Sequence, residues 1–386
     1  MEKMLAMFRM GEEPLSNGMN ILGAHIDSPR IDVKQNPLYE SEGMAYLDTH
    51  YYGGIKKYQW VTGPMALHGV VAKKDGSVEE ISIGEKESDP VFVITDLLVH
   101  LAANQMSKKA SEVIEGEKLD LLIGNSPLDK AEGLDEEEKE TIKANVLHIL
   151  KENYGIEEED FASAELEIVP AGKARDCGFD RSMILSYGQD DRVCAYTALM
   201  AEIAAKNPVH TTVTVLADKE EIGSVGNTGL NSDFTLHYIE GLCKAGNVDV
   251  RKVLKHSLCL SADVNAAYDP TFASVFEEKN SCYLNKGVVL TKYTGARGKS
   301  GSNDASAETM AKVIQIMDEA GVYWQIGELG AVDVGGGGTV AMYLANRNID
   351  TVDAGVPVLS MHAPFECIAK LDLYMAYKGF GAFYRD

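Results

Sequence analysis

The chain has 386 residues, of which 45% are hydrophobic and 25% charged, as in ordinary globular proteins. Its 59 acidic and 36 basic residues give a formal net charge of -23 at pH 7, which repels nucleic-acid phosphates and anionic lipid. No apolar run reaches the ~18 residues of a membrane helix, and the N-terminal residues lack the apolar core of a signal peptide. We therefore expect a cytoplasmic protein of more than one domain that binds neither nucleic acid nor membrane.

The first predicted element is a strand over residues 19–25 (MNILGAH), which leads into the stretch GAHIDSPR. His25 and Asp27 therefore lie one residue apart at the end of an apolar strand. A histidine in such a place is more often a hydrogen-bonded structural residue than a metal ligand. By itself the pair leaves both interpretations open.

Residues 33–172 have a different pattern. Tyrosine and glycine clusters come first, and a hairpin is predicted over 70–84 with Asp75 and Gly76 at its turn. An acidic helix is predicted over 135–155. Its apolar face comprises Ile142, Val146, Ile149 and Leu150. The pattern predicts a β-rich domain inserted into another domain.

After residue 172 strands and helices alternate. Helical periodicity predicts helices over 192–206 and 306–321, and short apolar runs predict strands over 211–218, 256–263 and 354–362. This alternation indicates an α/β domain, built from residues 1–32 and 173–386, in which sites form outside the carboxyl ends of the strands.

Side chains that can bind a metal gather at the ends of these predicted strands and at the start of the first of these helices. They are His25, Asp27, Asp190, Asp191, Asp218, Glu220, Glu221, Asp263 and His362. Taken singly, Asp190 and Asp191 are typical of a helix N-cap, and the two glutamates of solvated charges. Buried together in one crevice, however, such groups would need a cation. Histidines and carboxylates without cysteine suit zinc, cobalt or manganese, and a spare glutamate could act as the base of a two-metal hydrolase.

Five motifs occur in a characteristic order: GAHIDSPR, YGQDDR, DKEEIGS, SADVN and LSMHAPFE. In these motifs the chain resembles the aspartyl aminopeptidase and vacuolar aminopeptidase I family of dinuclear zinc aminopeptidases, from about residue 15 to the C-terminus. The resemblance implies an α/β catalytic domain with a mixed sheet and helices on both faces, interrupted at 33–172 by a β-rich dimerisation domain. It also implies hydrolysis of the N-terminal residue from peptides by a two-metal-activated water.

The resemblance further implies two divalent ions per subunit, zinc first and cobalt or manganese as alternatives. The implied ligands are the bridging Asp190, then His25 and Asp263 on one ion, and Glu221 and His362 on the other. Glu220 matches the general base, and Asp27 matches the acid that orients the first histidine. Asp191 is left outside the ligand set.

Members of this family assemble from dimers into dodecamers, so the resemblance implies a homo-oligomer. His100 matches a histidine that reaches into the neighbouring subunit's active site and helps to stabilise the tetrahedral intermediate. Because LLVHLA is apolar, the alternative is that His100 is a packed core residue.

Two glycine-containing segments remain. The segment 291–303 contains Lys292 and Lys299, and in resembling enzymes this region lines the pocket for the substrate's first side chain, where a cation would favour Asp or Glu. A solvated loop is the alternative. The stretch VGGGGT (334–339) lacks the Gly-Lys-Ser/Thr of a phosphate-binding loop, so we expect a tight turn near the site.

Family members usually carry a longer helical segment before the first metal histidine than the 24 residues found here. We therefore expect either a short variant or a protein that starts upstream of Met1. Two other functions stay open at this stage: a two-metal amidase or deacylase of small N-acyl substrates, and a catalytically silent assembly protein.

Overall fold

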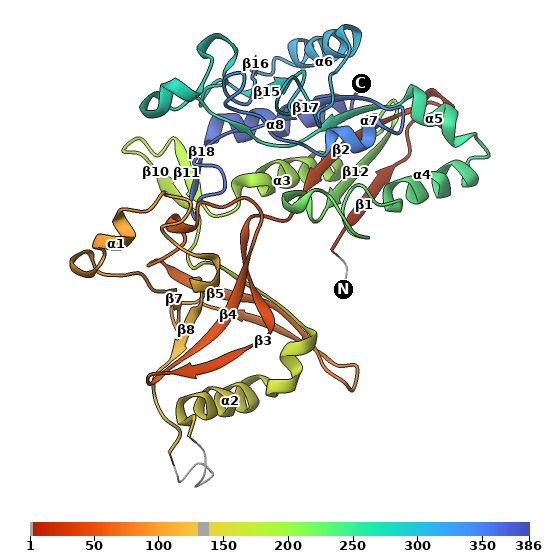
Figure 1. The fold of residues 1–386 in the computed structure, drawn as a ribbon. Coiled ribbons are helices and arrows are strands. Elements are labelled where there is room, and N and C mark those ends of the chain that lie inside the picture. The colour runs from red at the N-terminus through yellow and green to blue at the C-terminus, as the bar shows by residue number, and fades with distance from the viewer. Residues whose placement is uncertain (1–2, 130–138) are drawn as a thin grey trace. The chain divides into compact units, whose positions relative to one another are not determined.

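The computed structural model describes residues 3–129 and 139–386, which form two compact units (Figure 1). Unit 1 comprises Met1–Ser28, Arg175–Met361 and Glu366–Asp386, and unit 2 comprises Pro29–Ala174 and His362–Phe365. In the short segment 362–365, His362 makes two hydrogen bonds within unit 2. Its Nδ1 lies 2.8 Å from the carbonyl oxygen of Gly54, and its own carbonyl accepts from Trp60 Nε1 at 3.4 Å.

Unit 1 contains a seven-stranded mixed sheet in the order β1-β12-β2-β13-β17-β15-β16. The strands are β1 (Leu5–Arg9), β2 (Met19–His25), β12 (Thr211–Ala217), β13 (Leu258–Ser261), β15 (Val288–Thr291), β16 (Trp324–Ile326) and β17 (Asp350–Gly355). The central strands β12, β2, β13 and β17 are parallel, whereas β1 and β15 run antiparallel to their inner neighbours. The predicted mixed α/β sheet is confirmed.

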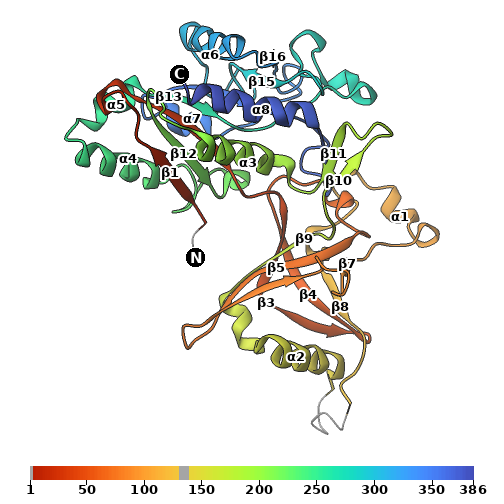
Figure 2. The ribbon, with the colours of Figure 1, turned by 180° about the vertical axis from the view of Figure 1, so that it is seen from behind.

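Helices cover both faces of this sheet. On one face lie α3 (Gln189–Ala204), α6 (Ala307–Glu319) and α8 (Lys370–Phe383), and on the other lie α4 (Phe234–Ala245), α5 (Val250–His256) and α7 (Ala341–Ala345). Successive strand residues point to opposite faces. Leu22 and Ala24 of β2 accordingly pack in the core with α3 and α8, while Met19 and Ile21 pack with α4 and α5. The two opposite views in Figures 1 and 2 both show α3 and α8 side by side.

A smaller five-stranded sheet of unit 1 has the order β10-β11-β19-β18-β14. Its strands are β10 (Arg175–Cys177), β11 (Met183–Ser186), β14 (Asn265–Ala266), β18 (Pro357–Leu359) and β19 (Glu366–Ala369). Short 3-10 helices of unit 1 are η1 (Leu15–Asn17), η7 (Glu220–Ile222), η8 (Pro270–Val275) and η9 (Glu278–Asn280).

The single strand predicted over 354–362 is wrong. The chain leaves the large sheet at Gly355 and enters the small sheet at Pro357. A Cβ at Gly355 would lie 1.8 Å from the carbonyl oxygen of Asp263, so only glycine fits this close approach. Proline has no N–H for a continuing ladder and is tolerated as the first residue of a strand. His362 consequently lies beyond β18, with a positive φ of 64°.

Unit 2 is built on an antiparallel sheet that closes on itself, because β5 pairs with β9 on one edge and with β7 and β6 on the other. Its strands are β3 (Arg30–Ser41), β4 (Met44–Tyr52), β5 (Pro64–Ala72), β6 (Val78–Ile83), β7 (Phe92–Ile94), β8 (Leu121–Gly124) and β9 (Ala164–Pro170). Its helices are α1 (Ala103–Met106), α2 (Thr141–Tyr154) and the 3-10 helices η2 (Lys57–Gln59), η3 (Val99–Leu101), η4 (Gly116–Lys118) and η6 (Glu158–Ser163). The predicted hairpin is confirmed as β5–β6, with Gly76 at a φ of 87°.

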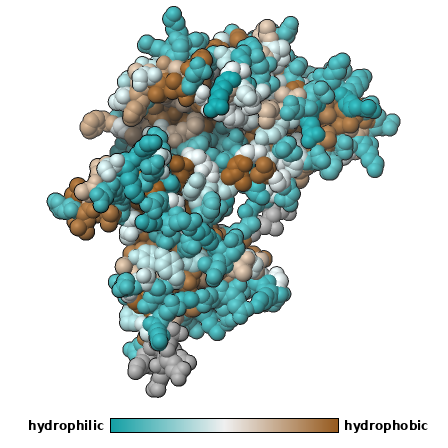
Figure 3. Space-filling view, viewed as in Figure 1, coloured by the Kyte–Doolittle hydropathy of each residue, from teal (hydrophilic) through white to brown (hydrophobic). Residues whose placement is uncertain are grey.

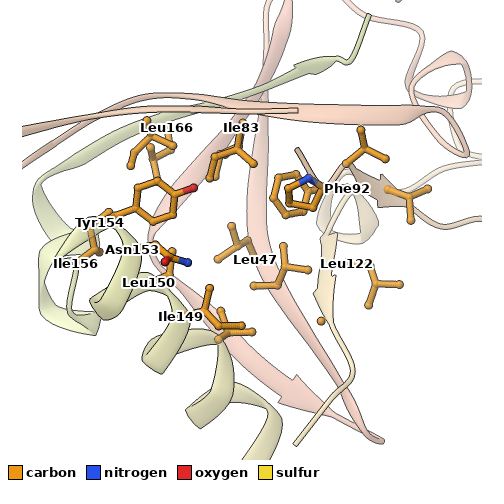
Figure 4. A pocket seen from close by; sticks show the side chains of 18 of the residues that line it. Leu47, Ile83, Phe92, Leu122, Ile149, Leu150, Asn153, Tyr154, Ile156 and Leu166 are labelled. Carbon is orange, nitrogen blue, oxygen red and sulfur yellow. The ribbon is translucent and has the colours of Figure 1, made fainter. Parts of the chain in front are cut away.

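Helix α2 packs its apolar face toward this closed sheet, as its periodicity predicts; residues 135–138 of the predicted helix lie outside the described residues. Between α2 and the sheet lies a cavity of about 630 Å³ (Figure 4). Leu150 and Tyr154 line it from the helix, and Leu47, Phe92 and Leu122 line it from the strands. None of the predicted metal ligands lines this apolar cavity, so the cavity is distinct from the candidate metal site.

The surface seen in Figure 3 is mostly hydrophilic, in keeping with the high content of charged residues. Within the described ranges, no helix combines the length and apolar character needed to cross a bilayer.

Candidate metal centre

The predicted ligands of unit 1 follow from the order of its parallel strands. His25 is the last residue of β2, and Asp263 lies two residues beyond the end of β13. Glu220 and Glu221 form the first turn of η7, just after β12. Because β12, β2 and β13 are adjacent and parallel, their carboxyl ends meet at one edge of the sheet.

Three carboxylates converge on one nitrogen of His25. Its Nε2 lies 3.2 Å from Asp190 Oδ1, 3.7 Å from Asp263 Oδ1 and 3.9 Å from Glu220 Oε2. The imidazole is 1% exposed, so water screens this concentration of negative charge poorly.

Asp27 contacts the other ring nitrogen of His25. The Nδ1 atom of His25 lies 3.0 Å from the carbonyl oxygen of Asp27 and 3.3 Å from its Oδ1. The same carboxylate accepts the backbone N–H of Glu220 at 3.0 Å and that of Glu221 at 3.2 Å. Asp27 therefore holds both the ring of His25 and the turn that carries the two glutamates.

The start of α3 brings Asp190 into the same place. The backbone N–H of Asp190 donates to Glu366 Oε2 at 3.0 Å, and its carbonyl accepts from the Ser28 hydroxyl at 2.7 Å. The neighbouring Asp191 is fully buried and accepts the backbone N–H of His25 at 3.3 Å. These contacts fix the backbone on both sides of the Asp190 carboxylate.

Burial raises the pKa of Glu220 to about 8, and the negative charge of Asp263 adds to this effect. Burial opposes protonation of His25, but its hydrogen bonds with Asp190, Asp263 and Asp27 outweigh this and hold its pKa well above the ordinary value. Burial also raises the pKa of Asp263. These shifts favour protons within the cluster, and a bound cation would replace them.

The donor atoms fit a divalent transition metal. The set His25, Asp190 and Asp263 and the set His25, Glu220 and Glu221 each offer ligand atoms that all lie within 4.8 Å of one another. Imidazole nitrogen and carboxylate oxygen are the usual zinc ligands besides thiolate. Zinc is therefore compatible with the chemistry of the residues present.

His362 has the geometry of an oriented ligand within unit 2. The contact between its Nδ1 and the carbonyl oxygen of Gly54 favours the tautomer with the proton on Nδ1, which presents the Nε2 lone pair as a metal donor. Most metal-ligating histidines are oriented by a partner of this kind.

His100 lies on the surface of unit 2, in the 3-10 helix η3. Several large apolar side chains around it are also exposed: Leu97, Leu98, Val99, Leu101 and Met106. In the described chain the alternative of a packed core histidine is therefore wrong.

The two lysines of segment 291–303 share one carboxylate. Lys299 Nζ lies 2.9 Å from Asp304 Oδ2, and Lys292 pairs with Asp304 Oδ1. Lys299 also lies over the ring of Tyr293, 3.7 Å from its centroid. Asp304 thus offsets part of the positive charge that the sequence places here.

Sequence reasoning missed the role of Glu366 and set Asp191 aside. Glu366 stands in the motif LSMHAPFE and is 1% exposed, yet a glutamate at the start of a strand has no distinctive local signal. Asp191 is adjacent to a predicted ligand, and its burial shows that it is part of the site's framework. Both side chains act through contacts with residues that are distant in the sequence.

The chain matches the family model "Aminopeptidase I zinc metalloprotease (M18)" over residues 1–384. It is 56% identical over 387 aligned residues to "Probable M18 family aminopeptidase 1" of Clostridium acetobutylicum, covering 99% of this chain and 82% of that protein. The crystal structure of aminopeptidase I from Clostridium acetobutylicum superposes with a TM-score of 0.95 at 54% identity, over 100% of this chain and 83% of that one. The mApe1 dodecamer of S. cerevisiae shares the fold, with a TM-score of 0.77 at 21% identity over 99% of this chain and 83% of that one.

The first prediction concerns Asp27. The substitution Asp27→Asn should weaken metal binding about 10- to 100-fold, because His25 and the glutamate turn lose their orienting carboxylate. Competition with a chromophoric chelator measures this affinity. Asp350→Asn, which changes an exposed carboxylate of β17, is the matched control. Equal affinities for the two variants would contradict the orienting role of Asp27.

Proposed function

We propose a mechanism for this chain, which belongs to the aminopeptidase I zinc metalloprotease (M18) family and is a metal-dependent aminopeptidase. It removes the N-terminal residue from peptides through a two-metal-activated water, with Glu220 as the general base. The observation that carries this proposal is the convergence of three carboxylates on His25 Nε2, two of them buried (Asp190 and Asp263) and one partly exposed (Glu220).

The proposed ligand set follows from the family resemblance and from the side chains at the carboxyl ends of β12, β2 and β13. Asp190 would bridge the two ions, His25 and Asp263 would hold one of them, and Glu221 and His362 would hold the other. The preorganised backbone around Asp190 and the oriented ring of His362 support these assignments. Zinc is the proposed metal, with cobalt or manganese as functional substitutes.

Bound divalent ions supply a Lewis acid that polarises the scissile carbonyl and lowers the pKa of water. Glu220 accepts the proton of the attacking water and returns it to the leaving amine. Its backbone N–H donates to Asp27, which holds the turn that carries the Glu220 carboxylate. Glu220 and Glu221 are adjacent in one turn, which allows one to act as base while the other binds metal.

We further propose that unit 2 is a dimerisation domain and that the active protein is a homo-oligomer, with a dodecamer as the expected form. The exposed apolar side chains around His100 support a subunit contact at this segment. In the assembly, His100 enters the active site of a neighbouring subunit and stabilises the oxyanion. The six cysteines are free in the structure, which fits the reducing cytoplasm that we propose as its location.

The substitution Glu220→Gln should lower kcat about 10²- to 10⁴-fold, because the isosteric amide cannot accept a proton. The purified variant should keep two metal ions per subunit by elemental analysis. Glu278→Gln, at an exposed position of η9, serves as the control and should leave kcat unchanged. If Glu220→Gln retains full turnover, Glu220 is not the base.

A substrate panel tests the reaction class. Peptides with N-terminal Asp, Glu, Leu or Lys should be cleaved with added zinc, cobalt or manganese, whereas N-acetylated peptides should resist. Cleavage of N-acyl substrates would indicate an amidase instead.

A variant of Asp304 tests the substrate pocket. Since Asp304 offsets the charge of Lys292 and Lys299, Asp304→Asn should raise kcat/KM for N-terminal Asp relative to Leu several-fold. An unchanged ratio of the two kcat/KM values would show that the two lysines do not line the pocket.

A mixing experiment tests His100. His100→Ala should lower kcat about 10²-fold while mass photometry shows an unchanged assembly, since one oxyanion donor is lost. His50→Ala, at an exposed position of β4, is the control. Mixed assemblies of His100→Ala and Glu220→Gln subunits should regain activity, because each Glu220-bearing site can receive His100 from a neighbour. No gain on reassembly would contradict a role in the neighbouring site.

A further inference from the structure

Another buried carboxylate of unit 1 lies outside the proposed ligand set and its supporting residues. Asp353 belongs to β17 and is 4% exposed. It pairs across the sheet with Ser261 of β13 and with Thr291 of β15. Its neighbours Val352 and Ala354 pack in the core with α3 and α8, so Asp353 points to the opposite face, the side covered by α7.

Four buried oxygen atoms meet here without direct hydrogen bonds. Both carboxylate oxygens of Asp353 lack a hydrogen-bond partner among the described residues, as do the hydroxyls of Ser261 and Thr339. Burial raises the pKa of Asp353 to about 7, while the hydroxyls of Thr339 and Ser261 are close enough to oppose this rise. The two hydroxyls therefore stand near the carboxylate but outside the geometry of direct donation.

Among the residues that the structure describes, no basic side chain offsets this charge. None of the ion pairs formed within residues 3–129 and 139–386 includes Asp353, and the nearby Asp263 adds a like charge. Cys259 lies on the same face of β13, and its thiol stays neutral because burial raises its pKa. A buried carboxylate without a compensating partner is destabilising, and two unpaired buried hydroxyls add to this effect.

The chemistry of these oxygen atoms indicates which kind of ligand they would bind. A carboxylate and two hydroxyls are hard oxygen ligands, without imidazole or thiolate, and such sets suit hard cations rather than zinc. They carry a single negative charge, which one monovalent cation neutralises. Thr339 directly follows the glycine-rich segment 335–338, which carries no side chains.

We propose that Asp353, Ser261 and Thr339 form a binding site for a monovalent cation of the size of sodium or potassium. The ion ties the end of β13, two residues before Asp263, to β17 and to the glycine-rich segment that precedes α7. The positive charge of the ion stabilises the ionised carboxylate of Asp353 and offsets its repulsion of Asp263. The site is separate from the proposed zinc ligands, and its occupancy does not depend on the peptidase mechanism.

Two measurements on the zinc-loaded protein test this site. Crystals grown in rubidium chloride should show an anomalous difference peak within coordination distance of Asp353, Ser261 and Thr339. At matched ionic strength, Tm in sodium or potassium chloride should exceed Tm in tetramethylammonium chloride by about 2 °C, because tetramethylammonium is too large to enter.

Variants separate the site from general salt effects. Asp353→Asn should remove both the rubidium peak and the difference in Tm, and Asp350→Asn should keep both. If Asp353→Asn does not fold, Thr339→Val, which removes one oxygen at nearly constant volume, should weaken the rubidium peak and reduce the Tm difference. The proposal is overturned if no rubidium peak appears, if a zinc peak or a water occupies the position, or if the variants respond to the cations like the parent protein.

Discussion

The repulsion among carboxylates around His25 is the constraint on which this structure depends. Asp190, Asp263 and Glu220 all approach the same imidazole nitrogen within 3.9 Å, and His25, Asp190 and Asp263 are buried. Such an arrangement is unfavourable without a positive charge at its centre. The parallel strands, the turn held by Asp27 and the start of α3 all serve to keep these groups together. Metal binding and the stability of this edge of the sheet are consequently coupled.

Much of the site was predictable because its residues stand at the ends of regular elements. The strand before His25, the strand before Glu220 and the helix after Asp190 all have clear periodicity, and strand order then brings their ends together. The residue types alone did not show which side chain binds a metal and which acts as the base. The order of the five motifs, through the family resemblance, supplied this assignment. The match to the family model and the 56% identity to the relative from Clostridium acetobutylicum show membership of the M18 family.

Other features depend on contacts that no local pattern reveals. The break between β17 and β18 arises from the close approach of Gly355 to the backbone of Asp263, which is 92 residues away in the chain (355 minus 263). Glu366 supports Asp190 through a hydrogen bond across the fold. The closure of the unit 2 sheet through β5 and β9, and the apolar cavity beside α2, likewise require the tertiary structure. Long-range pairing is the part of a fold that short-range periodicity cannot specify.

The most direct test of the proposed two-metal centre is an anomalous difference map at the zinc edge, calculated from crystals of the protein loaded with zinc. The account predicts two peaks about 3.5 to 4 Å apart, with Asp190 contacting both. His25 and Asp263 should contact one peak, and Glu221 and His362 the other. A single peak, or two peaks that Asp190 does not bridge, would contradict the account.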